Sequence, residues 1–168
     1  THPPVQQHAT SDNKAYIRNI SHFSTKEKNS IFWTEFLRTA QQLTNLFEKN
    51  KPTKNPHIGI NAGISNVSFN VTVKNAGAFI DICMGMSHEE NANLFNQLLK
   101  HKSKIEQLIG EQLKWDGPRI GRDRCIITSS VGIQIDRNNT SNWPEYHKII
   151  INKFILFRDA FIRYGISG

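Results

Sequence analysis

The stretch VSFNVTVKNAGAFIDICM, residues 67–84, alternates apolar and polar side chains with a period of two. Successive side chains of a strand point to opposite faces, so the apolar positions share one face and Ser68, Asn70, Thr72 and Lys74 share the other. The tetrapeptide KNAG at 74–77 interrupts the pattern and is typical of a hairpin turn. Strands with one apolar and one polar face belong mostly to antiparallel sheets that are covered on one side. Residues 67–84 therefore predict two adjacent strands of such a sheet.

Long amphipathic helices are expected on either side of this hairpin. The first begins at a capping box formed by Ser24 and Glu27, and its apolar stripe continues as far as Phe47. The second covers residues 89–109 and carries its own apolar stripe. It is expected to end at Gly110, because glycine readily adopts the left-handed conformation that closes a last turn.

The remaining elements are a third helix and several short strands. The helix is expected to begin at a second capping box, Asn142 with Glu145, and to follow the seven-residue apolar repeat of residues 143–164. A turn at Ser129-Ser130 is expected to separate the last two strands. The further predicted strands cover residues 57–63, 113–115, 125–128 and 131–136.

Single-sided stripes on all three helices, together with one-sided strands, favour two packed layers. The predicted fold is α+β, with an antiparallel sheet of five or six strands and three long amphipathic helices packed mainly on one face. Residues 1–23 contain Pro3 and Pro4 and no sustained period, so a flexible arm or linker is expected there. Residues 24–168 are expected to form a single α+β domain.

The 168-residue chain is 38% hydrophobic and carries a formal net charge of +7 at pH 7. This balance favours a polyanionic partner such as nucleic acid, with an anionic membrane surface as the lesser alternative. Cys83 and Cys125 show no paired spacing, so buried free thiols and a cytoplasmic location are expected. No segment approaches the roughly 20 apolar residues that span a bilayer. Because the chain opens on Thr1 without a signal-peptide region, an excised domain or processed chain is expected.

The sequence contains no established motif for catalysis or metal binding. It lacks HExxH, GxSxG and GxxxxGK[ST], and its 7 histidines are dispersed. A restriction-type metal site needs an acidic residue on one strand and a D/E-x-K pair on the next, and no expected strand carries that pair. Asp81 is accordingly expected to be an exposed or edge-facing strand residue. The sequence predicts no catalytic residue, no metal ligand and no cofactor.

Basic residues are the remaining candidates for a binding site. The stretch IEQLIGEQLKWDGPRIGRDR, residues 105–124, joins the second helix to a group of arginines near Trp115, a residue assigned to the core. Arginine forks beside an aromatic ring can hold phosphate or stack on a base. A solvated hairpin whose charges pair with one another fits the same residues. The candidate phosphate contacts are Lys74, Lys100, Lys102, Lys104, Arg119, Arg122 and Arg124.

Four segments occur in the same order as in one prokaryotic family. They are FWTEFL (32–37), IGINAGISNVSFNV (58–71), EENANLFNQLLKHKSKIEQLIGEQLKW (89–115) and WPEYHKIIINKFILFRDAF (143–161). Over residues 31–163 the chain resembles number 4268 in the "domain of unknown function" series. The most specific part is the run Ile105, Glu106, Gly110, Leu113 and Trp115. The chain departs from the family pattern at Phe79, where arginine is common, and at Trp115-Asp116-Gly117, where Trp-Glu-Arg is usual.

The resemblance implies a C-terminal domain that is often fused to a restriction-like endonuclease domain. We therefore expect a non-catalytic accessory module of a restriction- or defence-type nuclease protein, contacting DNA or the nuclease domain. Two alternatives stay open. One is a protein-interaction or dimerisation domain, with a homodimer formed through the polar sheet face or an exposed strand edge. The other is a divergent metal-dependent nuclease that uses Asp81 and a carboxylate from elsewhere in the chain.

Overall fold

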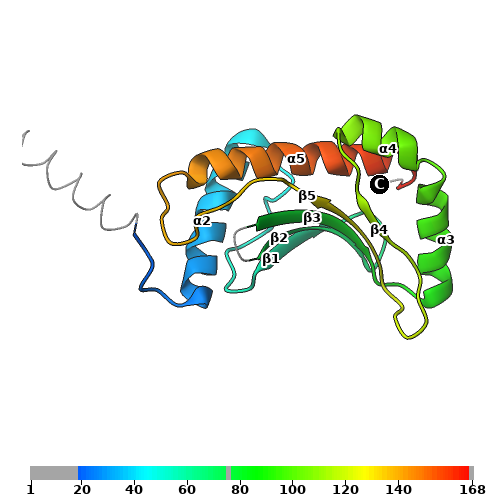
Figure 1. Ribbon diagram of the computed structural model, residues 1–168, viewed down its shortest axis with the longest axis horizontal. Coiled ribbons are helices and arrows are strands. Elements are labelled where there is room, and N and C mark those ends of the chain that lie inside the picture. The colour runs from blue at the N-terminus through cyan, green and yellow to red at the C-terminus, as the bar shows by residue number, and fades with distance from the viewer. Residues whose placement is uncertain (1–18, 75–76, 167–168) are drawn as a thin grey trace, which may run out of the picture.

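A computed structural model describes residues 19–74 and 77–166, and Figure 1 shows its ribbon. A five-stranded antiparallel sheet in the order β1-β2-β3-β5-β4 forms its centre, which confirms the predicted antiparallel sheet. The strands are β1 (His57–Asn61), β2 (Val67–Lys74), β3 (Gly77–Met84), β4 (Lys114–Asp116) and β5 (Cys125–Ser130). The helices within these residues are α2 (Thr25–Leu43), α3 (His88–Leu99), α4 (Lys102–Ile109) and α5 (Trp143–Tyr164).

The sheet is arched (Figure 1), and its two faces differ in chemistry. The apolar side chains of β2 and β3 are buried at every second position, as the alternation in residues 67–84 predicts. Helix α5 runs along the convex face, and the rings of Phe154, Phe157 and Phe161 lie around that of Phe69 on β2. Most of the alternate positions, on the concave face, carry polar residues, although Phe79 and Ile126 also lie there, and no described helix covers this face.

The helices do not all lie on the convex face. Helix α2 packs against the start of α5 at one end of the arch, where the ring centroids of Phe32 and Trp143 are 5.1 Å apart. Helix α3 stands at the opposite end of the arch (Figure 1). The part of the chain that the structure describes contains four helices. The predicted set of three long helices on one face is therefore not confirmed.

The predicted helix over residues 89–109 is two helices, α3 and α4, which change direction at Lys100-His101 (Figure 1). An unbroken helix would place Lys102 in the same stripe as Leu98 and Ile105, because residues four and seven apart share a helix face. In the structure Lys102 is exposed, whereas Leu98 and Ile105 are buried. The break thus keeps a charged side chain out of the core.

The helix ends agree only in part with the predictions. The backbone N–H of Glu27 donates to Oγ of Ser24 at 3.2 Å, so Ser24 caps the helix, and the hydroxyl of Ser24 donates to Oε1 of Glu27 at 3.1 Å. Helix α2 ends at Leu43, because the next residue adopts an extended backbone, and Phe47 is buried outside the helix. The side chain of Asn142 makes no capping hydrogen bond, because its backbone is not extended as a capping residue requires. The second capping box was therefore a wrong prediction.

Residues 131–136 do not form the predicted strand. Strand β5 continues through Ser129-Ser130, which pair with Ile80 and Phe79, so the predicted turn is also absent. One further hydrogen bond joins the N–H of Val131 to the carbonyl of Ala78 at 3.1 Å. Because β3 begins at Gly77, the residues after Val131 have no strand left to pair with.

The chain before α2 contacts the domain. Ile20 is buried, and its backbone N–H donates to the carbonyl of Asn138 at 2.8 Å. The rest of the predicted arm, residues 1–18, lies outside the described residues. Among residues 19–74 and 77–166, none of the helices combines the length and the apolar character that a membrane span requires.

Candidate functional site

The strand register defines which side chains share the concave face of the sheet. Cross-strand partners lie opposite one another and point to the same side. One row across the sheet consists of Gly59, Asn70, Asp81, Thr128 and Lys114. The neighbouring row consists of Asn61, Ser68, Cys83, Ile126 and Asp116. Amide, hydroxyl and charged groups dominate both rows, so this face is chemically suited to a polar partner.

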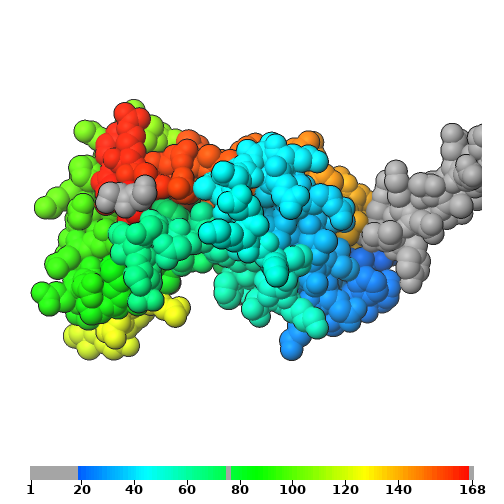
Figure 2. Space-filling model, turned by 180° about the vertical axis from the view of Figure 1, so that it is seen from behind, coloured from blue at the N-terminus to red at the C-terminus, as the bar shows by residue number. Residues whose placement is uncertain are grey.

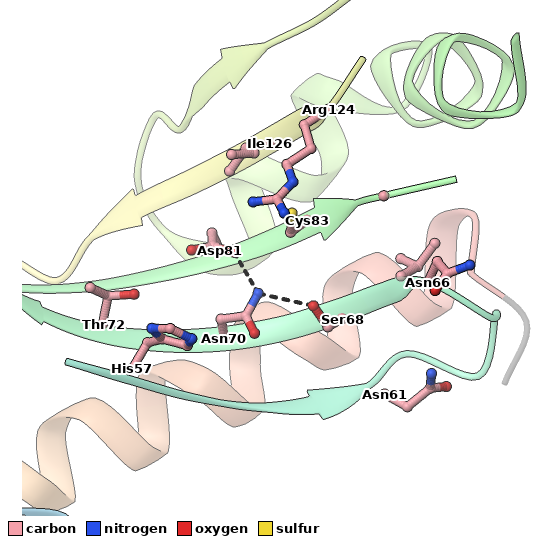
Figure 3. Close-up of a pocket in the computed structure, with 12 residues that line it drawn as sticks. His57, Asn61, Asn66, Ser68, Asn70, Thr72, Asp81, Cys83, Arg124 and Ile126 are labelled. Atoms are coloured by element: carbon pink, nitrogen blue, oxygen red, sulfur yellow. Dashed lines mark hydrogen bonds between the residues drawn. The ribbon is translucent and has the colours of Figure 1, made fainter. Parts of the chain in front are cut away.

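Apart from Gly59, the members of these rows that come from β1, β2 and β3, together with Ile126 of β5, line a groove with a volume of about 580 Å³. In the space-filling view of Figure 2, the hollow lies between two flanks. One flank is formed by α3 and the hairpin that joins β4 to β5, and the other by α2 and the residues that follow it. Figure 3 shows the lining side chains, among them His57, Asn70, Asp81, Cys83 and Arg124.

Asp81 faces this groove from the central strand β3. Its Oδ1 accepts a hydrogen bond from Nδ2 of Asn70 at 2.9 Å, and the same nitrogen donates to Oγ of Ser68 at 3.1 Å (Figure 3). Burial raises the pKa of Asp81, although the Asn70 hydrogen bond and the charge of His57 act in the opposite direction. The expected exposed or edge-facing position is corrected, because β3 is paired on both sides and Asp81 is half-buried.

Cys83 lies on the same strand, and the guanidinium of Arg124 extends toward it (Figure 3). Burial raises the pKa of the Cys83 thiol, and the positive charge of Arg124 offsets part of this effect. The thiol is therefore protonated at neutral pH, which is unfavourable for a nucleophile. Both cysteines are free, as predicted; Cys125 is buried, but Cys83 is half-buried in the groove rather than in the core.

The groove offers few ligands for a metal ion. Within the described residues, no three His, Cys, Asp or Glu side chains lie close enough together to hold one. The nuclease alternative needs a second carboxylate beside Asp81, and the described residues that line the groove include no other. The side chains in the groove can donate and accept hydrogen bonds, which is the chemistry of binding.

The three predicted arginines lie on the hairpin between β4 and β5 or at its end. Arg124 is exposed and lines the groove. Arg119 and Arg122 each contact one carboxylate oxygen of Asp116 at 2.6 Å. Burial acts to raise the pKa of Asp116, but the hydrogen bonds from the two guanidinium groups outweigh it and hold this pKa below its ordinary value. Charge pairing within the hairpin is therefore present for two of the three arginines.

The four predicted lysines are divided between the two sides of the sheet. Lys74 ends β2 at a position that belongs to the concave face, where it pairs with Gly77. Lys100, Lys102 and Lys104 lie where α3 meets α4, on the convex side (Figure 1). The structure thus brings Lys74 and the arginines to the concave side, and it does not bring the other three lysines there.

Sequence reasoning missed the contact between Asn70 and Asp81. A hairpin that leaves two residues between its strands pairs Lys74 with Gly77, and counting back along both strands places Asn70 opposite Asp81. This signal was available in residues 67–84. The alternation could not show, however, that the polar face of the sheet is left open by the helices.

The sequence also matches a known family. The family described as "Domain of unknown function (DUF4268)" matches residues 29–165. The chain belongs to this family. No curated protein and no solved structure matches the chain significantly. The region matched by DUF4268 includes all five strands, helices α3 to α5 and most of α2.

Residues 105–115, the segment with the most specific resemblance to DUF4268, have a structural role in this chain. Oε2 of Glu106 accepts a hydrogen bond from the backbone N–H of Leu113 at 2.7 Å and another from Nε1 of Trp115 at 3.1 Å. Gly110 has a φ of +86° and ends α4 in the left-handed conformation, as predicted. The ring of Trp115 is half-buried against the core rather than enclosed by it. These contacts hold β4 against α4 and so position the hairpin.

Proposed function

We propose that this domain is a non-catalytic module that binds DNA through its concave sheet face and the adjacent β4–β5 hairpin. The observation that supports this most is the groove, which polar side chains and Arg124 line and no described element covers. Amide, hydroxyl and guanidinium groups are the donors that hold phosphate oxygens in protein–DNA complexes. The net charge of +7 would also attract a polyanion.

The size of the open face suits a nucleic acid. Adjacent strands lie about 4.8 Å apart, so the steps from β1 across to β4 span about 19 Å. Along the helix axis one DNA strand carries a phosphate about every 3.4 Å, so a duplex whose axis crosses the strands would present about six of them over this distance. The hollow in Figure 2 runs between two flanks, and such a groove accommodates a linear polymer better than an enclosed cavity does.

We further propose that DNA binding serves a restriction- or defence-type nuclease, to which the domain is fused or with which it associates. The family resemblance supports this, because similar domains often follow a restriction-like endonuclease domain. In this proposal the nuclease supplies the cleavage chemistry, and the present domain holds it on DNA in the cytoplasm of a prokaryote.

The test measures binding of the 168-residue chain to labelled duplex and single-stranded DNA between about 50 and 200 mM salt. Two matched variants each remove three positive charges: Arg119/Arg122/Arg124→Ala on the hairpin and Lys100/Lys102/Lys104→Ala at the α3–α4 junction. We expect affinity to fall with salt and to drop at least about tenfold in the hairpin variant, with a salt slope smaller by up to about three. The junction variant should bind nearly as tightly as the natural chain.

Equal losses in the two variants would contradict the proposed surface, since net charge alone would then control binding. Absence of binding at low salt would contradict DNA contact altogether. It would favour the alternative of a protein-interaction or dimerisation domain. Sedimentation of the natural chain tests that alternative, because a concentration-dependent homodimer without DNA binding is its expected signature.

A further inference from the structure

The tip of the β4–β5 hairpin, residues 117–124, has a defined shape. The N–H of Arg122 donates to the carbonyl of Arg119 at 3.2 Å, and Gly121 between them has a φ of +80° that favours glycine. The side chains of Arg119 and Arg122 both end on the carboxylate of Asp116. These contacts fix the turn before any partner binds.

Helix α3 supports the base of the hairpin on both limbs. The buried side chain of Asn91 donates from Nδ2 to the carbonyl oxygen of Asp123 at 2.8 Å. On the other limb, Gly117 lies so close to Phe95 that a Cβ at this position would come within 2.7 Å of the ring. Contacts with α3 therefore hold the base of the hairpin in place.

Ile120 occupies the tip with its side chain wholly in solvent. Its exposed fraction is 106%, whereas the other large hydrophobic residues exposed in the described part of the chain reach at most 43%. An isoleucine that is fully exposed on a braced turn contributes nothing to the core of its own chain. Its side chain is therefore free to contact a partner.

The position of the tip relates it to the groove. The hairpin projects from the sheet on the same side as the concave face (Figure 1). Proteins that bind the minor groove often insert an apolar side chain between base pairs and kink the duplex, while cationic side chains contact the surrounding backbone. The hairpin tip carries both an apolar side chain and cationic side chains, because Ile120 lies between Arg119 and Arg122. These two arginines share the single carboxylate of Asp116, so an excess positive charge remains.

We propose that Ile120 is an apolar wedge that inserts between base pairs of duplex DNA, with Arg119 and Arg122 on the phosphates beside it. This inference rests on the proposed function, since it requires a duplex against the concave face. Insertion of Ile120 into an apolar pocket of a partner protein is the less favourable alternative. Closing such a pocket over the tip would remove water from both guanidinium groups without offering them phosphates.

The test uses the 168-residue chain and a short duplex with a TA step, which unstacks easily, and with 2-aminopurine as the adenine of that step. The fluorescence of 2-aminopurine rises when stacking is lost, and a pair of dyes on the duplex ends reports bending. Ile120→Ala removes the wedge, and Ile120→Phe supplies another apolar wedge. Leu43→Ala, which shortens an exposed apolar side chain at the end of α2, is the control.

The natural chain, Ile120→Phe and Leu43→Ala should all raise the fluorescence and shorten the distance between the duplex ends. Ile120→Ala should bind about tenfold more weakly with an unchanged salt slope, and it should lose both signals. Salt-dependent binding by the natural chain without these signals, or equal signals from Ile120→Ala, would overturn the wedge and leave the proposed function intact. Absence of binding by the natural chain at low salt would overturn both.

Discussion

His147 on α5 is fully buried, and neither of its ring nitrogens has a hydrogen-bond partner among the described residues. Its ring centroid lies 4.5 Å from that of Phe32 and 5.5 Å from that of Phe36, both on α2. Burial lowers its pKa to about 3 from an ordinary value of 6.5. Spacing along the sequence could not reveal this, because the two rings nearest to His147 lie on a helix about a hundred residues away.

Acidification should destabilise the protein through this residue. As the pH falls from about 6.5 toward 3, the unfolded chain binds a proton at His147 and the folded chain does not, so the free energy of unfolding decreases. At pH 5 the decrease relative to neutral pH should be about 2 kcal/mol. His147→Phe should remove this part of the pH dependence, and His147→Leu repeats the test with a smaller side chain. Urea unfolding at about pH 7 and 5 measures the effect. If the free energy of unfolding fell as much in both variants as in the natural chain, the prediction would be contradicted.

Among the elements, the position of β4 depends on the carboxylate of Glu106 on α4. Glu106→Ala leaves the N–H groups of Leu113 and Trp115 without this acceptor, so the free energy of unfolding should fall by about 2 kcal/mol. Glu106→Gln keeps an acceptor oxygen and should lose less. Gln107→Ala, at the exposed neighbouring position on α4, is the matched control. If urea unfolding gave Glu106→Ala and Gln107→Ala the same stability, the hydrogen bonds of Glu106 would contribute nothing to holding β4.

Elements with a local signal were predictable from the sequence, and those set by distant partners were not. The alternation in residues 67–84 sufficed for β2 and β3, because side-chain period and turn residues lie within one stretch. The break between α3 and α4 also left a trace, since Lys102 interrupts an apolar stripe. The end of β5 has no such signal in the local sequence. It depends on the place where β3 begins, about fifty residues earlier in the chain.

In the whole molecule, the arch separates residues that the sequence places close together. Lys104 and Arg119 are fifteen positions apart, yet α4 lies on the convex side and the hairpin on the concave side (Figure 1). Counting charges along the chain could therefore propose seven basic contacts but could not assign them to one surface. The strand register does assign residues to a surface, because alternate positions of β2 must share the concave face.

The concave face can be tested at this scale with two variants of equal charge. Ser68→Glu/Thr72→Glu adds two negative charges to the concave face, and Gln107→Glu/Asn152→Glu adds two at exposed positions of α4 and α5. Each variant lowers the net charge from +7 to +5 (7 − 2 = 5), so long-range attraction of DNA changes by a similar amount.

We expect the concave-face variant to lose most of its DNA affinity, because each new carboxylate would lie next to the phosphates that the groove holds. The helix-side variant should bind only slightly more weakly than the natural chain. Thermal unfolding checks that both variants remain folded. Equal affinities of the two folded variants would exclude the groove as the DNA path. The hairpin arginines, which neither variant changes, would then have to bind DNA without the groove.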